Sequence, residues 1–281
     1  MGDRLRAVWD SDDLDSTEKR LLTLLTLEAV PSARAEVLSQ LARVHGLRAD
    51  PAEAVRLLDE AAREAGPDLT AQARIHLERG RLRRLDGDPE QALPLFEAAF
   101  QAALACGAEF VAVDAAHQAG IVAQDRTGRI EWTRRGMDLA QHSADPQIVP
   151  WLGPLLTNLG WEYFESGDYS PALDAFERAL GQRERDHAPE AEVELARYAV
   201  ARTLRALGAP AEAAELLERS VTGIAAEDGW FREELAECYA ALGRDSAARV
   251  QAGLAIPLLA VADPQFTPGS DRERRLRELS R

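Results

Sequence analysis

The sequence predicts an all-α solenoid of about six antiparallel helix pairs. Its composition is dominated by Ala, Leu, Glu and Arg, residues that favour helix. Small residues also recur at a spacing of about 40 residues, and self-similarity at such a period is typical of stacked helical repeats. The first small residue of each copy is Ala42, Gly80, Gly120, Gly160, Ala201 or Ala236.

Each copy is expected to hold two helices joined by a short turn. Asp50-Pro51 and Asp88-Pro89 combine an N-cap aspartate with a proline at the first helical position. The remaining turns are predicted at Thr127-Gly128, Gly167-Asp168, Gly208-Ala209-Pro210 and Gly243-Arg244-Asp245. The second helix of each copy has Ala54, Ala92, Trp132, Ala172, Ala213 or Ala248 near its start, and five of these six residues are alanine.

The two ends of the array must be closed, because a terminal repeat otherwise exposes an apolar face. We expect residues 1–30 to form an N-terminal capping region, in which Asp15-Ser16-Thr17-Glu18 caps a leucine-rich helix. Residues 31–262 form the repeat array, and residues 263–281 form a linker and a C-terminal capping helix. The apolar stretch Ala255–Val261 is expected to be covered by that helix or by a second subunit in a homodimer.

One segment carries a family pattern in full. It reads Leu159-Gly160-x-x-Tyr163, then Gly167-Asp168-Tyr169, then Ala172-x-x-x-Phe176-x-x-Ala179. This segment resembles the tetratricopeptide repeat, in which small residues mark the crossing of the two helices and large rings fill the gap between them. The resemblance implies a right-handed superhelix in which the first helix of each pair lines a concave groove. The period departs from the family's usual value of about 34 residues.

Charge and composition exclude several classes of protein. The net charge is −15 with a pI near 4.9, so the chain repels phosphate backbones and nucleic acid is not an expected partner. No apolar run is long enough to span a membrane, and no secretory signal is recognisable at the N-terminus. The two cysteines, Cys106 and Cys238, lack metal-binding or redox spacing, which is consistent with a reducing cytoplasm.

No catalytic motif is recognisable in the sequence. It contains no H-E-x-x-H, no phosphate-binding glycine loop and no nucleophile elbow. The five histidines show no spacing suited to a shared metal ion, and the aspartates near the turns are explained by helix capping. We therefore expect neither an enzyme nor a cofactor nor a metal site.

Groove positions of the family, transferred to this sequence, give a candidate ligand site rich in arginine and aromatic residues. Such residues anchor many binding interfaces. The alternative is that the rings pack against neighbouring helices and the arginines form salt bridges with nearby acids. The candidate residues are Arg74, Arg81, Arg84, His117, Gln124, Asn158, Trp161, Phe164, Tyr198, Arg202 and Arg205, followed by an acidic sixth copy with Glu233 and Glu237.

The predicted function is a non-catalytic adaptor that binds a protein or peptide segment, which the arginines would favour if it were acidic. The alternative is a sensor module that binds a small anionic ligand or a signalling peptide. The family's best-known clamp for chaperone tails uses Lys and Asn in the groove. Here the only lysine, Lys19, lies outside the repeats and the only asparagine is Asn158, so that role is disfavoured.

Overall fold

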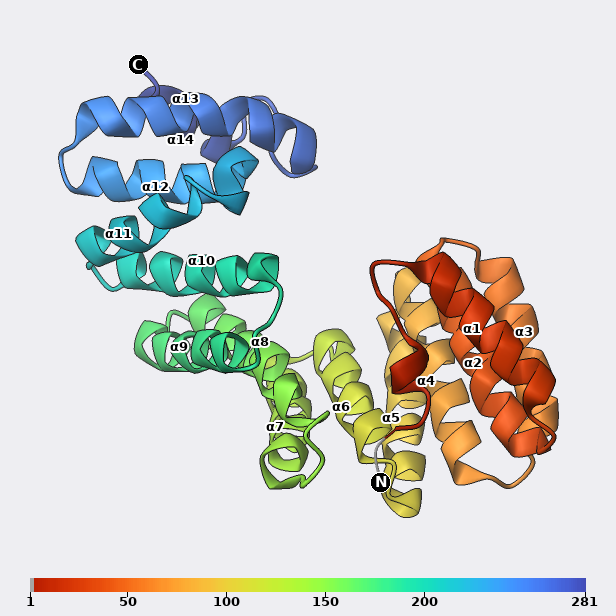
Figure 1. Cartoon of the computed structure of the whole chain (residues 1–281). Coiled ribbons are helices and arrows are strands. Elements are labelled where there is room, and N and C mark those ends of the chain that lie inside the picture. Colours follow the sequence, from red (N-terminus) through yellow and green to blue (C-terminus); the bar gives the residue numbers. More distant parts are fainter. Residues whose placement is uncertain (1–2) are drawn as a thin grey trace. The chain divides into compact units, whose positions relative to one another are not determined.

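The computed structural model describes residues 3–281, apart from the side chains of residues 224 and 226. The described chain contains fourteen α-helices and no strand (Figure 1). The helices are α1 (Leu14–Leu27), α2 (Pro31–Leu47), α3 (Pro51–Ala65), α4 (Leu69–Leu85), α5 (Pro89–Cys106), α6 (Glu109–Val122), α7 (Arg126–His142), α8 (Leu152–Glu165), α9 (Tyr169–Arg185), α10 (Glu190–Ala206), α11 (Pro210–Ser220), α12 (Gly229–Ala241), α13 (Asp245–Ala262) and α14 (Asp271–Leu279). Short 3-10 helices, η1 (Arg6–Val8), η2 (Val149–Trp151) and η3 (Ile224–Glu227), lie between them.

The all-α class and the helix-pair repeat are confirmed. Six pairs run from α2/α3 to α12/α13, with α1 before them and α14 after them. The chain divides into two compact units, residues 1–158 and residues 159–281, and the boundary falls within α8. None of the described helices is both long enough and apolar enough to cross a membrane.

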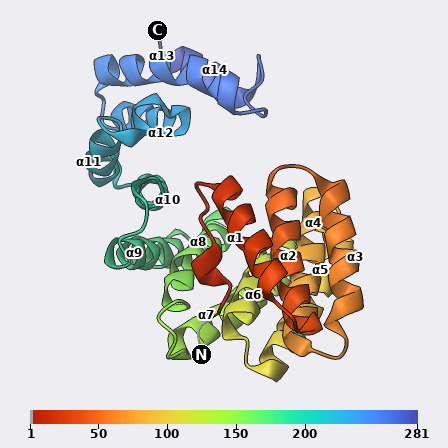
Figure 2. The ribbon, with the colours of Figure 1, turned by 45° about the vertical axis from the view of Figure 1, so that its right-hand side comes forward.

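In unit 1 the second helices of the pairs begin where the sequence places a capping aspartate. The carboxylates of Asp50, Asp88 and Asp125 accept backbone N–H groups in the first turns of α3, α5 and α7. The pairs α2/α3 and α4/α5 lie side by side in two views of the molecule (Figure 2). Their contact surface is rich in alanine, and this allows the helix backbones to approach closely.

Small residues occupy the predicted helix crossings. A Cβ atom added to Gly80 on α4 would lie 2.5 Å from Cε1 of Phe96 on α5. In unit 2 a Cβ on Gly160 would lie at the same distance from Cε1 of Phe176. Both rings are fully buried, so they fill the gap that each glycine leaves. The position therefore needs glycine wherever an aromatic ring faces it.

The C-terminal end of unit 2 is closed by the chain itself. Leu276 of α14 is buried in one cluster with Ala255 and Leu259 of α13 and with Phe266 of the linker. The guanidinium of Arg272 also bonds the carboxylate of Glu233 on α12. The C-terminal helix therefore covers Ala255 and Leu259, whereas Val261 at the end of the stretch is 91% exposed.

Two local predictions are wrong. The helix near the N-terminus is capped by Asp13, which accepts the Ser16 backbone N–H, rather than by the segment that begins at Asp15. The predicted turn at Thr127-Gly128 lies inside the first turn of α7, because Asp125 caps that helix one residue before Arg126. In both cases an aspartate slightly earlier in the chain satisfies the free N–H groups of the helix start.

Candidate functional site

The first helices of the pairs in unit 1, α2, α4 and α6, carry several of the predicted groove residues. Arg74 on α4 is buried, and its guanidinium bonds the carboxylates of Asp3 and of Glu36 on α2. The side chains of Arg74 and Asp3 are only 7% and 6% exposed. This arginine is therefore committed to partners within the chain.

Arg81 lies about two helical turns further along α4 and is also paired. Its guanidinium bonds Glu78 on the same helix and Asp114 on α6, and both acids are buried. Burial raises the pKa of Glu78. Burial also opposes ionisation of Asp114, but the cations of Arg81 and Arg43 hold its pKa below the ordinary value. The group joins two successive repeats through charge.

His117 and Asn158, both predicted groove residues, contact each other. Nδ2 of Asn158 lies 3.2 Å from Nδ1 of His117, and the His117 ring packs edge-on against Trp151 at 5.5 Å. Burial lowers the pKa of His117, so the neutral ring is favoured. A neutral Nδ1 accepts a hydrogen bond from the Asn158 amide.

Arg84 and Gln124 are exposed at the edge of this region. Arg84 borders a cavity of about 170 Å³ together with Arg81 and Gln118. The Gln124 amide donates to the Glu90 carboxylate, at 3.2 Å. Neither residue joins the buried ion pairs of α4 and α6.

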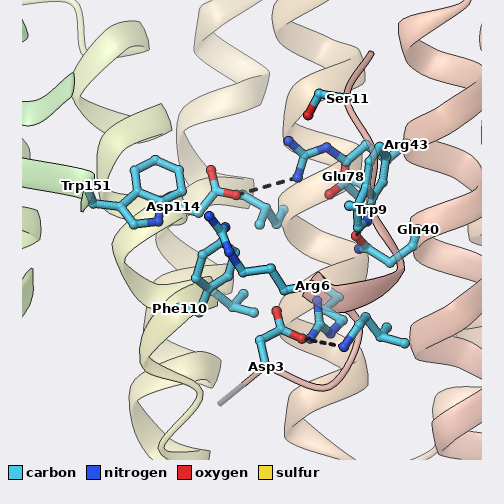
Figure 3. A pocket seen from close by; sticks show the side chains of 14 residues that line it. Asp3, Arg6, Trp9, Ser11, Gln40, Arg43, Glu78, Phe110, Asp114 and Trp151 are labelled. Atoms are coloured by element: carbon cyan, nitrogen blue, oxygen red, sulfur yellow. Dashed lines mark hydrogen bonds and ion pairs between the residues drawn. The ribbon is translucent and has the colours of Figure 1, made fainter. Parts of the chain in front are cut away.

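The N-terminal segment, residues 3–9, lies against the same helices and was not among the predicted site residues (Figure 3). Leu5 is buried, and Arg6 stacks over the Phe110 ring at 4.6 Å. The Trp9 indole N–H donates to Gln40, at 2.9 Å. A cavity of about 240 Å³ remains between the segment and α2, α4 and α6. No sequence motif marks these contacts, because they join residues far apart in the chain.

In unit 2 the predicted aromatic residues and one arginine come together. The guanidinium carbon of Arg202 on α10 lies 5.8 Å from the Trp161 ring and 5.3 Å from the Phe164 ring on α8. Its Nη1 also donates to the Tyr198 hydroxyl, at 3.2 Å. All four side chains are partly exposed, so they form an arginine–aromatic cluster at the surface of unit 2.

Arg205 lies one turn after Arg202 but has a different environment. Both its Nε and Nη2 atoms bond the carboxylate of Glu234 on α12, which is buried. In the sixth pair, the two predicted acidic residues are also engaged, since Glu233 binds Arg272 and Glu237 binds Arg275 of α14. Arg202 is thus the predicted unit 2 arginine for which no carboxylate partner is found among the described residues.

The described residues offer no cluster of three or more His, Cys, Asp or Glu able to hold a metal ion. Cys238 is buried, and burial raises its thiol pKa to about 12, which disfavours the nucleophilic thiolate. Cys106 is exposed, and Thr70 donates a hydrogen bond to its sulfur at 3.5 Å. The polar chemistry of both units is therefore that of ion pairs, hydrogen bonds and ring stacking.

These features define the chain as a helical-repeat array that presents charged and aromatic side chains on the first helices of its pairs. Residues 153–186 match the sequence profile of the tetratricopeptide repeat, in the segment where the pattern is fullest. The chain carries a tetratricopeptide repeat there and has the fold of tetratricopeptide-repeat arrays, so the resemblance is confirmed. No curated protein sequence matches it.

Three solved structures illustrate the fold. The APC/C hetero-tetramer Cut9–Hcn1 has a TM-score of 0.67 and 15% identity, over 95% of this chain and 48% of that one. A signal transduction ATPase with a tetratricopeptide repeat sensor, from Pyrococcus horikoshii, gives 0.71 and 14%, over 95% and 41%. The apo form of RapI gives 0.68 and 11%, over 95% and 78%. This chain thus spans less than half of the first two, and identities this low indicate a shared fold alone.

Proposed function

We propose that this chain is a non-catalytic scaffold that binds a peptide segment of a partner protein, and that Arg202 anchors an acidic side chain of that segment. Tetratricopeptide arrays are interaction scaffolds and are generally non-catalytic. The observation that carries the proposal is the arginine–aromatic cluster of unit 2, formed by Trp161, Phe164, Tyr198 and Arg202.

The cluster is suited to a carboxylate. The neighbouring rings and the Tyr198 hydroxyl hold the Arg202 guanidinium in place, so little side-chain entropy is lost when an anion binds. A guanidinium binds a carboxylate through two parallel hydrogen bonds, and the partly exposed rings supply apolar contact. An acidic side chain next to an aromatic or aliphatic one would satisfy both parts of the cluster.

Arg205 supports the same reading by contrast. Its carboxylate position is already filled by Glu234 from within the chain. In this pair a carboxylate binds two nitrogen atoms of an arginine on α10, whereas no such carboxylate is found for Arg202 among the described residues. We assign Arg205 a structural role and Arg202 the ligand role, although both were expected in the groove.

The alternative ligand, a small anionic molecule or signalling peptide, would use the same guanidinium. One neighbour by fold is described as containing a tetratricopeptide repeat sensor. A small anion would gain only the charge interaction, whereas a peptide would also gain contact with Trp161 and Phe164. The peptide is favoured because both rings border the arginine.

The proposal is tested by fluorescence anisotropy with a labelled heptapeptide that carries three glutamates and one phenylalanine. Arg202→Gln should weaken binding at least tenfold, and raising the salt concentration should weaken binding to the wild type. Arg249→Gln, an exposed arginine on α13, is the matched control and should bind as the wild type does. Equal binding by the Arg202 variant would contradict the proposal. Competition by citrate with no contribution from the peptide phenylalanine would favour the small-anion alternative.

A further inference from the structure

The N-terminal segment, residues 3–9, has the contacts of a bound peptide. We propose that the face of α2, α4 and α6 is a second peptide-binding site, specific for a carboxylate two residues before a leucine. Residues 3–9 occupy this site within the chain, and a partner segment of the same chemistry displaces them. The proposal concerns unit 1 alone and does not depend on Arg202.

The carboxylate position is built around Arg74. Its Nη2 atom binds Asp3, while its Nε atom donates to Glu36 at 3.0 Å, and Glu36 thereby fixes the orientation of the guanidinium. Charge-assisted bonds between such buried partners are strong and directional. The Leu5 backbone N–H also donates to the Asp3 carboxylate, at 3.0 Å. A carboxylate at this point in the segment is therefore recognised by direct contacts.

The leucine position follows two residues later. The Leu5 side chain is 1% exposed and belongs to the core cluster of α2 and α3. Between these two anchors, Arg4 remains 40% exposed but donates to the Ala33 carbonyl at 3.0 Å. Asp3 and Leu5 are thus held against the helices while Arg4 stays at the surface, in a turn that leads into the 3-10 helix η1.

The far end of the segment adds aromatic contacts. The Trp9 indole donates to Gln40, and the Arg43 guanidinium carbon lies 5.0 Å from the Trp9 ring. Arg6 stacks on Phe110 of α6. The segment thus contacts three successive first helices, which is the face where a peptide ligand of a helical-repeat array would lie (Figure 3).

Three observations indicate that the segment is an occupant rather than a part of the repeat framework. No residue of η1 is buried, although Val8 packs half-buried against the core cluster, so Leu5 is the one residue of the segment that lies inside the core. The core cluster that contains the apolar face of α2 is also covered by α1, through the buried Leu21. The cavity of about 240 Å³ beneath the segment remains unfilled by it. A framework element would pack without such a space.

Occupation within the chain has a definite consequence for affinity. A segment tethered by a few residues reaches an effective concentration on the order of millimolar. A competing peptide binds only the fraction of molecules in which the segment has left, so its apparent affinity is reduced by that fraction. Weakening the segment's own anchors should therefore strengthen binding of an external peptide.

The experiment uses the full-length chain and a labelled peptide with the sequence of residues 3–9, Asp-Arg-Leu-Arg-Ala-Val-Trp. The double variant Asp3→Ala/Leu5→Ser removes both anchors of the internal segment and should bind this peptide at least tenfold more tightly than the wild type. Asp12→Ala, an exposed aspartate outside the segment, is the matched control and should bind as the wild type does. Adding Arg74→Ala to the double variant should abolish the gain. A peptide with Asn and Ser at the two anchor positions should not bind.

Circular dichroism of the double variant separates the possible outcomes. Retained helix content together with tighter peptide binding supports the proposal. Retained helix content without tighter binding overturns it, and so does loss of helix content that added peptide does not restore, because the segment is then structural. A dimer of the double variant at assay concentrations, seen by light scattering, would also overturn it, since a second copy would then cover the face.

Discussion

The guanidinium of Arg81 on α4 bonds the carboxylate of Asp114 on α6, and thereby joins two successive repeats through a buried ion pair. Arg81 is 11% exposed and Asp114 is 2% exposed. Helical repeats contact mainly their neighbours, so a pair of this kind couples the folding of one repeat to the next.

Replacing Asp114 with alanine should strongly destabilise the chain. The change leaves Arg81 and Arg43 without their shared carboxylate, and breaking a buried pair on one side costs about 3–5 kcal/mol. Urea unfolding followed by circular dichroism measures the loss. The matched control is Asp59→Ala, whose pair with Arg79 is exposed and should contribute about 0–1 kcal/mol. Similar losses for the two variants would contradict the assigned role of Asp114.

Replacing Gly160 with alanine should destabilise unit 2 by about 1–3 kcal/mol, because the added Cβ would overlap the buried Phe176 ring. Gly253 on α13 provides a control of opposite sign. A Cβ there meets no atom within 4 Å, so Gly253→Ala should stabilise the helix by up to about 1 kcal/mol. The midpoints of thermal unfolding of the two variants should shift in opposite directions. A stabilised Gly160→Ala variant would contradict the close packing of Gly160 against Phe176.

The sequence predicted the helix pairs because their signals are local. Gly160 and Phe176 lie within one pair, and capping aspartates such as Asp88 lie beside the helix starts they determine. The cluster of Arg202 with Trp161 and Phe164 was also anticipated, since the repeat register places all three on first helices. Whether they bind a ligand stays a prediction.

Contacts between residues far apart in the chain were beyond the sequence pattern. Asp3 and Arg74 are separated by 71 residues, and no periodicity relates them. Arg81 was expected to face a ligand, but its environment depends on which acid of the next repeat lies opposite, and that acid is Asp114. The expectation that arginines of both units share one channel with Trp161 stays a prediction.

Removing residues 264–281 should lower the melting temperature or cause self-association. The deletion takes away Phe266 and Leu276, which cover Leu259 and Ala255 of α13. Differential scanning calorimetry and light scattering report the two outcomes. The point variant Leu276→Ala should cost about 2–5 kcal/mol by itself, because the leucine is 1% exposed. Unchanged stability and mass in the truncated chain would show that α14 is not a cap.

Stability should fall as the pH is lowered through the titration range of His117. Burial lowers the folded-state pKa of this ring, and Arg81 and Arg84 act in the same direction while Asp114 opposes them. At pH values around the unfolded pKa of about 6.5, the unfolded chain therefore binds more protons than the folded chain, so acidification favours unfolding. Protonation also removes the Nδ1 acceptor that Asn158 uses. The stabilising contribution is fully present above the unfolded pKa and is lost as the pH falls toward the folded pKa.

The measurement is the melting temperature between pH 7.5 and pH 5.0 for the wild type and for His117→Gln. The variant should lose part of the pH dependence of the melting temperature. The rest should remain, because burial also lowers the pKa of His76. His142→Gln, which replaces an exposed histidine in the same way, is the matched control. If the melting temperature changes with pH equally in the wild type and in His117→Gln, then protonation of the buried His117 ring does not destabilise the fold. Its contact with Asn158 would then contribute nothing to the pH dependence.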